Sequence, residues 1–230
     1  MVRNPFKLVL ISTLLFGLCA PADLHAKSKR SREKRTTRVS KFVSATPFST
    51  VVIDAGHGGF DRGGIRQNII PEKDVALDVA LRLQKSLRSA GLKTVMTRSD
   101  DRFVTLDRRV AIANAHRDAI FMCIHFNAGR RISARGIETF HAATSEASLA
   151  GRIQRNLMRT TTGDNRGVKR ASFYVLRKTK IRAVLAECGF LTNPQDAALA
   201  RRPSYRQKLA EEISLAIVEE QNSLRSFSRL

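Results

Sequence analysis

Apolar residues along this chain follow two different patterns. Residues 50–54, 92–97 and 119–126 are short apolar runs without polar alternation, which is typical of strands buried on both faces of a sheet. Residues 72–90 instead carry apolar side chains three and four positions apart and stop at Gly91, which predicts a helix. The same patterns predict further strands at 136–141, 173–176 and 182–187, and further helices at 106–116, 145–158 and 205–222. The expected helix caps are Thr105 or Asp107, Thr144 or Ser145, and Ser204.

The order of these elements indicates the fold class. Strands alternate with helices, and several of the strands are apolar on both faces. This arrangement predicts an α/β fold: a single domain with a mostly parallel twisted sheet of about six strands and helices on both of its faces. In such sheets the functional side chains gather at the carboxyl ends of the strands.

The first 26 residues have the pattern of an export signal. Arg3 and Lys7 precede an apolar run at residues 8–19, which is too short to span a bilayer comfortably, and residues 24–26 offer a cleavage site. An uncleaved membrane anchor is the alternative. We therefore expect an exported protein that acts in the periplasm, in the cell envelope or outside the cell.

Charge distinguishes the segment that follows. The chain has a net charge of +21, and removal of residues 1–26 would leave +20. Residues 27–47 are basic, polar and unpatterned, which predicts a flexible linker that is either simply solvated or makes electrostatic contact with an anionic wall or membrane surface. Residues 48–230 remain as the folded domain. Export argues against a nucleic-acid partner, and the basic residues lack the interleaved aromatics of single-strand binding sites.

Two cysteines remain after the predicted signal. Cys123 and Cys188 both lie in apolar, strand-like runs far apart in the sequence. We expect buried free thiols, although an exported protein would permit a disulfide.

Four side chains suited to metal binding or proton transfer fall at one predicted edge of the sheet. His57 and His125 follow or end strands, Glu187 ends another strand, and Glu72 begins the helix at 72–90. A catalytic zinc takes three nitrogen or oxygen ligands and keeps one position for water, and a carboxylate that is not a ligand can accept the proton of that water. Two histidines, one ligating glutamate and one free glutamate meet this requirement, although each residue alone also has an ordinary structural explanation.

Five segments of the chain resemble, in order, the zinc-dependent N-acetylmuramoyl-L-alanine amidases that act on bacterial cell walls (amidase type 3). They are IDAGHGGFDRGG, EKDVALDVALRLQKSL, VMTRSDDRFVTLDRRVAIAN, IHFNA and GVKRASFYVLRKTKIRAVLAECGFLTNP. The resemblance implies that His57, Glu72 and His125 are the zinc ligands and that Glu187 is the catalytic glutamate. Asn127 either supports the metal site or contacts substrate, or else only satisfies local backbone groups.

The resemblance also implies an activity. This is hydrolysis of the amide between N-acetylmuramic acid and L-alanine in peptidoglycan, by zinc-activated water, with Glu187 taking the proton of the water and passing it to the leaving amine. We expect peptidoglycan as the partner and a monomeric enzyme. Two alternatives stay open: a zinc peptidase that cuts within the stem peptide, and a non-catalytic wall-binding protein, which should have lost one of the four residues.

Overall fold

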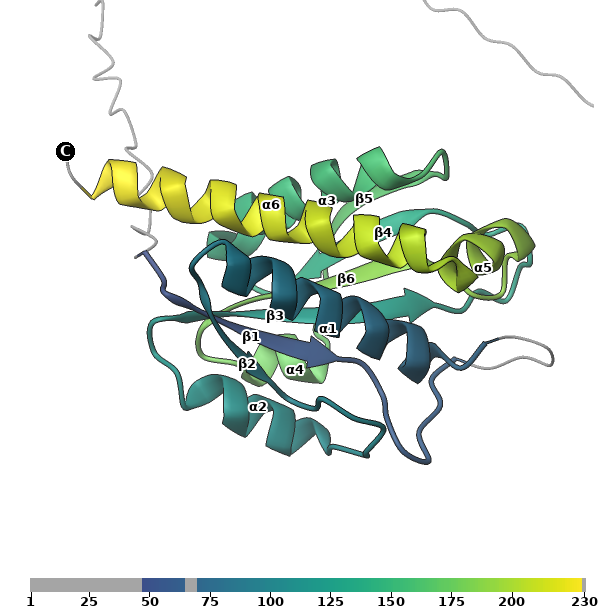
Figure 1. Cartoon of the computed structure of the whole chain (residues 1–230), viewed down its shortest axis with the longest axis horizontal. Coiled ribbons are helices and arrows are strands. Elements are labelled where there is room, and N and C mark those ends of the chain that lie inside the picture. The colour runs from purple at the N-terminus through teal and green to yellow at the C-terminus, as the bar shows by residue number, and fades with distance from the viewer. Residues whose placement is uncertain (1–46, 65–69, 229–230) are drawn as a thin grey trace, which may run out of the picture. The chain divides into compact units, whose positions relative to one another are not determined.

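A six-stranded sheet runs through the part of the chain that the computed structural model describes, residues 47–64 and 70–228 (Figure 1). Its strands, in their order across the sheet, are β2 (Lys93–Met96), β1 (Thr50–Ala55), β3 (Ala119–Asn127), β6 (Arg182–Phe190), β4 (Ile137–His141) and β5 (Asn165–Arg170). The first four are parallel, whereas β4 pairs antiparallel with β6 and parallel with β5. The predicted α/β class and mostly parallel sheet are confirmed. The predicted signal at 1–26 and all but the last residue of the predicted linker at 27–47 lie outside the described residues.

Helices cover both faces of the sheet (Figure 1). On one face lie α1 (Glu72–Ser89), α3 (Ala147–Leu157) and α6 (Pro203–Phe227), with α5 (Pro194–Arg201) packed beside α6. On the other face lie α2 (Leu106–Asn114) and α4 (Tyr174–Lys178). Two short 3-10 turns, η1 (Thr144–Glu146) and η2 (Met158–Thr160), flank α3. In the described part of the chain, no helix is both long enough and apolar enough to cross a membrane.

Burial on both faces explains the missing polar alternation in the central strands. In β1, Val51 and Ile53 pack into the core beneath α1, α3 and α6, whereas Val52 between them packs into the core beneath α2 and α4. The two cysteines fall in different cores in the same way, Cys188 in the first and Cys123 in the second, and both are buried free thiols as predicted.

Several helix boundaries agree with the sequence signals. The α1 helix ends before Gly91, whose φ of 82° is a left-handed value that glycine adopts without strain. Thr105 caps α2, because its side chain accepts a hydrogen bond from the backbone N–H of Arg108. The predicted Ser204 cap is wrong: α6 begins at Pro203, since the fixed φ of proline suits the first turn of a helix.

The region before β6 was predicted incorrectly. Residues 173–176 were expected to form a strand, but they lie at the start of α4. The strand in this region is β5, which is largely exposed at the edge of the sheet and therefore lacks the apolar run that marks the other strands. The short helix α5 was also missed, although Asn193 caps it and proline opens it.

Candidate metal centre and active site

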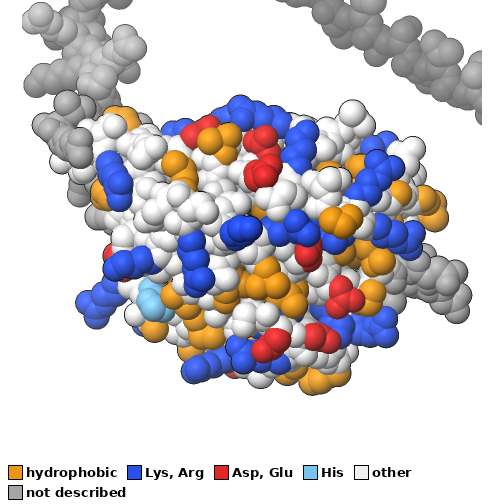
Figure 2. Space-filling view, viewed as in Figure 1, with side chains coloured by type: hydrophobic (Ala, Val, Ile, Leu, Met, Phe, Trp, Pro, Cys, Tyr) orange, Lys and Arg blue, Asp and Glu red, His pale blue; other side chains and the backbone are white. Residues whose placement is uncertain are grey.

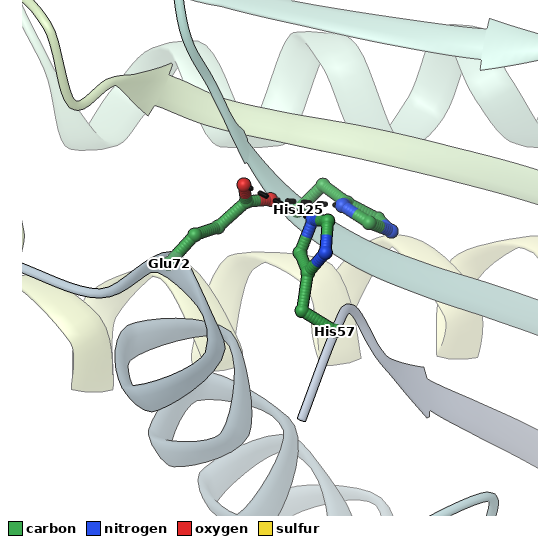
Figure 3. Close-up of side chains that lie close together, drawn as sticks. All are labelled: His57, Glu72 and His125. Carbon is green, nitrogen blue, oxygen red and sulfur yellow. Dashed lines mark hydrogen bonds and ion pairs between the residues drawn. The ribbon is translucent and has the colours of Figure 1, made fainter. Parts of the chain in front are cut away.

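Three side chains meet where β1 and β3 end and α1 begins (Figure 3). His57 follows β1, His125 lies near the end of β3, and Glu72 is the first residue of α1. Nε2 of His57 lies 3.1 Å from one oxygen of Glu72, and Nδ1 of His125 lies 2.8 Å from the other. One carboxylate therefore bridges two imidazole rings.

Asp61 and two backbone amides fix the orientation of these groups. Nδ1 of His57 is 2.9 Å from a carboxylate oxygen of Asp61, which leaves Nε2 directed at Glu72. Glu72 is almost fully buried, and each of its oxygens accepts a backbone N–H, from Phe126 at 3.0 Å and from Gly64 at 3.0 Å. Histidines that bind metals characteristically pair their second ring nitrogen with a carboxylate, as His57 does here.

The backbone at His57 is held in an uncommon conformation. His57 has a φ of 60°, a left-handed value that costs energy for a residue with a Cβ atom. Arg109 of α2 stabilises this turn, because one Nη atom donates to the carbonyl oxygen of His57 at 2.7 Å and the other to Asp54 and to the Ala55 carbonyl, both at 2.6 Å. The end of β1 is therefore tied to α2 by a buried ion pair.

Arg98 holds the same turn from the other side. Its fully buried guanidinium donates to the carbonyl oxygens of Ala55 at 3.0 Å, Gly56 at 2.7 Å and Lys73 at 2.8 Å. It therefore joins the segment that carries His57 to the first turn of α1, which carries Glu72. Neither arginine was among the predicted site residues, because an arginine in a polar loop or on a predicted helix gives no sign in the sequence that it will be buried.

Glycine in the turn allows the two histidine-bearing segments to approach. A Cβ atom on Gly56 would lie 2.4 Å from Cε1 of His125, which is closer than two carbon atoms can pack. The segment after β1 thus needs glycine at this position for His125 to reach Glu72.

We expect Arg98→Lys to destabilise the protein by about 2 to 4 kcal/mol and to weaken metal binding, because a lysine cannot donate to several carbonyl groups from one planar fork. Urea unfolding and a zinc titration check this. Arg88→Lys is the matched control, since Arg88 is exposed at the end of α1 and should change stability by less than about 0.5 kcal/mol. Equal stability of the two variants would show that Arg98 does not hold the turn.

Electrostatics in the cluster favours an ion pair among its members. Burial alone lowers the pKa of His125, but the hydrogen bond and charge of Glu72 outweigh it and raise that pKa to about 9. At His57 too, burial lowers the pKa, but the hydrogen bond and charge of Glu72 outweigh it and raise the pKa. Burial raises the pKa of Glu72, yet the two histidines hold it well below its usual range. Glu72 is thus an anionic ligand candidate placed between two nitrogen donors.

Glu187 lies beside this cluster and has a different environment. It pairs with His125 in the register of β3 and β6, and its Oε2 atom is buried without a hydrogen-bond partner in the described part of the chain. Burial raises the pKa of Glu187 to about 7, and the nearby charges of Glu72 and Glu138 act in the same direction. A carboxyl group with such a pKa can both accept and return a proton near neutral pH.

Asn127 contacts a glutamate that sequence analysis missed. Its side-chain nitrogen donates to Oε1 of Glu138 at 2.6 Å, and Glu138 lies directly opposite Glu187 in the pairing of β4 with β6. The predicted strand-end site residues lie at the carboxyl ends of parallel strands, whereas Glu138 lies at the amino end of an antiparallel strand. Its sequence signal is weak, because Glu138 follows a single apolar residue, Ile137, and is followed by Thr139, whereas Glu187 ends a continuous apolar run.

Comparison with known proteins identifies the family. The sequence profile of the N-acetylmuramoyl-L-alanine amidases matches residues 51–219. The chain belongs to this amidase family. The resemblance seen in the sequence is thereby confirmed, and all the predicted site residues fall within the matched segment of the amidase domain.

Individual relatives agree with this assignment. The chain is 41% identical to the uncharacterized protein YqiI of Bacillus subtilis over 168 residues, which cover 71% of this chain and 81% of YqiI. It is 38% identical to the N-acetylmuramoyl-L-alanine amidase LytC of the same organism, again over 71% of this chain but only 34% of LytC. Among solved structures, the amidase AmiC2 of Nostoc punctiforme superposes with a TM-score of 0.72 at 34% identity, covering 76% of this chain and 98% of AmiC2.

Proposed function

We propose that this amidase-family domain hydrolyses the amide bond between N-acetylmuramic acid and L-alanine in peptidoglycan, and that it uses zinc. One observation carries the proposal: a carboxylate bridges two imidazoles next to a second carboxyl group whose buried oxygen has no partner. Membership of the amidase family indicates which bond is hydrolysed. The geometry of the site indicates which residues carry out the hydrolysis.

The residues present fit a zinc ion. His57, Glu72 and His125 each offer one ligand atom, and these atoms lie within 4.8 Å of one another. Two nitrogens and one oxygen are a donor set that zinc favours, and three protein ligands leave a position for water. Zinc bound there would polarise the scissile carbonyl and lower the pKa of its water.

The residues around the cluster would then transfer the proton and hold the ligands in position. Glu187 accepts the proton of the attacking water and returns it to the leaving amine, for which a pKa near 7 is well suited. Asp61 keeps the His57 ring in the orientation that directs Nε2 into the site. Arg98 and Arg109 hold the turn that carries His57, so they act as positioning residues.

Digestion of purified peptidoglycan tests the proposal. Products are identified by mass spectrometry with and without a zinc chelator. We expect stem peptides that begin with L-alanine, released only when zinc is present. Shortened stems still attached to the sugar would instead establish a zinc peptidase that cuts within the stem peptide. Binding to peptidoglycan without any cleavage would establish a wall-binding protein.

The proposed substrate lies outside the cytoplasm, which agrees with the export signal predicted at residues 1–26. The net charge of +21 would attract an anionic polymer, and Lys and Arg side chains are spread widely over the face that carries α1 and α6 (Figure 2). We propose that the basic segment at 27–47 adds to this attraction to the wall or membrane surface.

Metal binding is expected to depend on pH. Glu72 raises the pKa values of His57 and His125, the latter to about 9, so zinc must displace a proton from the His125 ring at pH 7 to 8. Zinc affinity should therefore rise with pH up to about 9. Isothermal titration calorimetry in buffers of different ionisation enthalpy measures the released protons. Zinc binding with no proton release at pH 7 would contradict the assignment of these ligands.

A further inference from the structure

Two cations converge on the buried carboxylate of Glu138. Oε2 of Glu138 accepts hydrogen bonds from Nε of Arg166 at 3.1 Å and from Nζ of Lys169, while Oε1 accepts from Asn127. Only 5% of Glu138 is exposed, so its charge needs such partners. Both cations belong to β5, the edge strand nearest to β4.

An irregularity in β5 places Arg166 at this position. Ile137 of β4 pairs with Asn165, but Thr139 pairs with Val168, so β5 contains one extra residue opposite Glu138. Gly167, with a φ of 77°, lies in this bulge. Bulges of this kind redirect side chains and are frequent beside functional sites.

The cations retain unused binding capacity. The side chain of Arg166 is 32% exposed and that of Lys169 is 42% exposed. The two Nη atoms of Arg166 have no hydrogen-bond partner among the residues that the structure describes, and its guanidinium lies over the ring of Phe190, 4.8 Å from the ring centroid. Two positive charges share one negative charge, so the group keeps a net positive charge and free N–H donors.

This group lies close to the proposed general base. Glu138 is directly opposite Glu187, and β5 is two strands away from β6 in the sheet. Neighbouring strands are about 4.8 Å apart, so β5 lies about 10 Å from Glu187, which is about three residues of extended peptide. A peptide whose cleaved amide lies beside Glu187 could therefore reach the cations with its second or third residue.

We propose that Arg166 and Lys169, held by Glu138, form a subsite for a free carboxylate of the stem peptide, two or three residues from the cleaved amide. The proposal rests on the proposed function, since it needs a peptide in the site. Charge-assisted hydrogen bonds from a guanidinium and an ammonium recognise a carboxylate much better than its neutral carboxamide. The subsite would thus select stems by their charge.

The test compares two muramyl peptides that differ only in a carboxylate or a carboxamide at the second residue, and a second pair that differs at the third. For one of the pairs we expect the full chain with zinc to prefer the carboxylate by about ten- to a hundredfold in kcat/KM. Arg166→Gln and Lys169→Gln should each reduce this preference. Arg170→Gln is the matched control: it removes one charge from the same strand, but Arg170 bonds the Ala142 carbonyl instead of Glu138, so the preference should persist.

Equal rates of the unmodified chain on both members of each pair would overturn the subsite, and so would variants that slow both members equally. Binding of the same pairs to the Glu187→Gln protein, measured by calorimetry, tests the subsite independently of turnover. A carboxylate preference in binding without hydrolysis by the unmodified chain would support the subsite and refute the proposed activity. Hydrolysis without a preference for the carboxylate would support the proposed activity and refute the subsite.

Discussion

Replacing Glu187 with glutamine is expected to lower kcat by about a thousandfold, because the positioned group that accepts and returns the proton is lost. Zinc content should stay at that of the unmodified protein, since Glu187 lies outside the three-residue cluster. Release of stem peptides, measured together with the zinc content of each protein, checks both expectations. Glu211→Gln, an exposed change on α6, is the control and should retain full activity.

The same variant has an expected effect on stability. Burial raises the pKa of Glu187 from 4.5 to about 7 in the folded state, so the stability that this group contributes falls as pH rises from about 4.5 through 7. Glutamine stays neutral at every pH. The zinc-free variant should therefore be at least as stable as the zinc-free unmodified protein at pH 8 in thermal unfolding. A strongly destabilised variant, or one with unchanged kcat, would contradict the role assigned to Glu187.

Replacing Glu72 with glutamine is expected to reduce zinc affinity by at least about a hundredfold, since even residues that only support a ligand typically contribute ten- to a hundredfold. The change removes a ligand charge and the partner of both histidines. It also puts an amide NH2 group against the backbone N–H of Phe126 or of Gly64, which now donate to the carboxylate. Activity should fall with the metal.

Zinc competition against a chromogenic chelator measures this loss, and adding excess zinc should restore part of the activity. Asp74→Asn is the matched control, because Asp74 is an exposed acid in the same first turn of α1 and contacts none of the histidines. If Glu72→Gln bound zinc as tightly as Asp74→Asn, the proposed ligand set would be wrong.

Much of the fold follows from how the strands are buried. The runs at 50–54 and 119–126 are mostly apolar and show no polar alternation because β1 and β3 lie between two helical layers, and this signal is readable without a structure. β5 lacks it, since an edge strand with exposed side chains needs no apolar pattern. Residues 173–176 are rich in strand-forming types, yet Phe173 is the N-cap of α4 and residues 174–176 form its first turn, which packs Val175 and Leu176 into the core.

Part of the site could also be predicted from the order of the strands. His57, His125 and Glu187 could be grouped because parallel strands bring their carboxyl ends to one edge of a sheet. Glu138 could not, because the antiparallel direction of β4 becomes evident only when its pairing with β6 is known. Arg98 and Arg109 could not be predicted either. Their guanidinium groups donate hydrogen bonds to backbone carbonyl oxygens that come together only in the folded turn.

The position of the metal tests the central claim most directly. Crystals of the full chain grown with zinc, measured above and below the zinc absorption edge, locate the ion by its anomalous signal. We predict a single peak about 2.0 to 2.2 Å from Nε2 of His57, a carboxylate oxygen of Glu72 and a ring nitrogen of His125, with Glu187 close by but not bonded to the ion. A peak bonded to Glu187 or Glu138, or one without both histidines, would contradict the account.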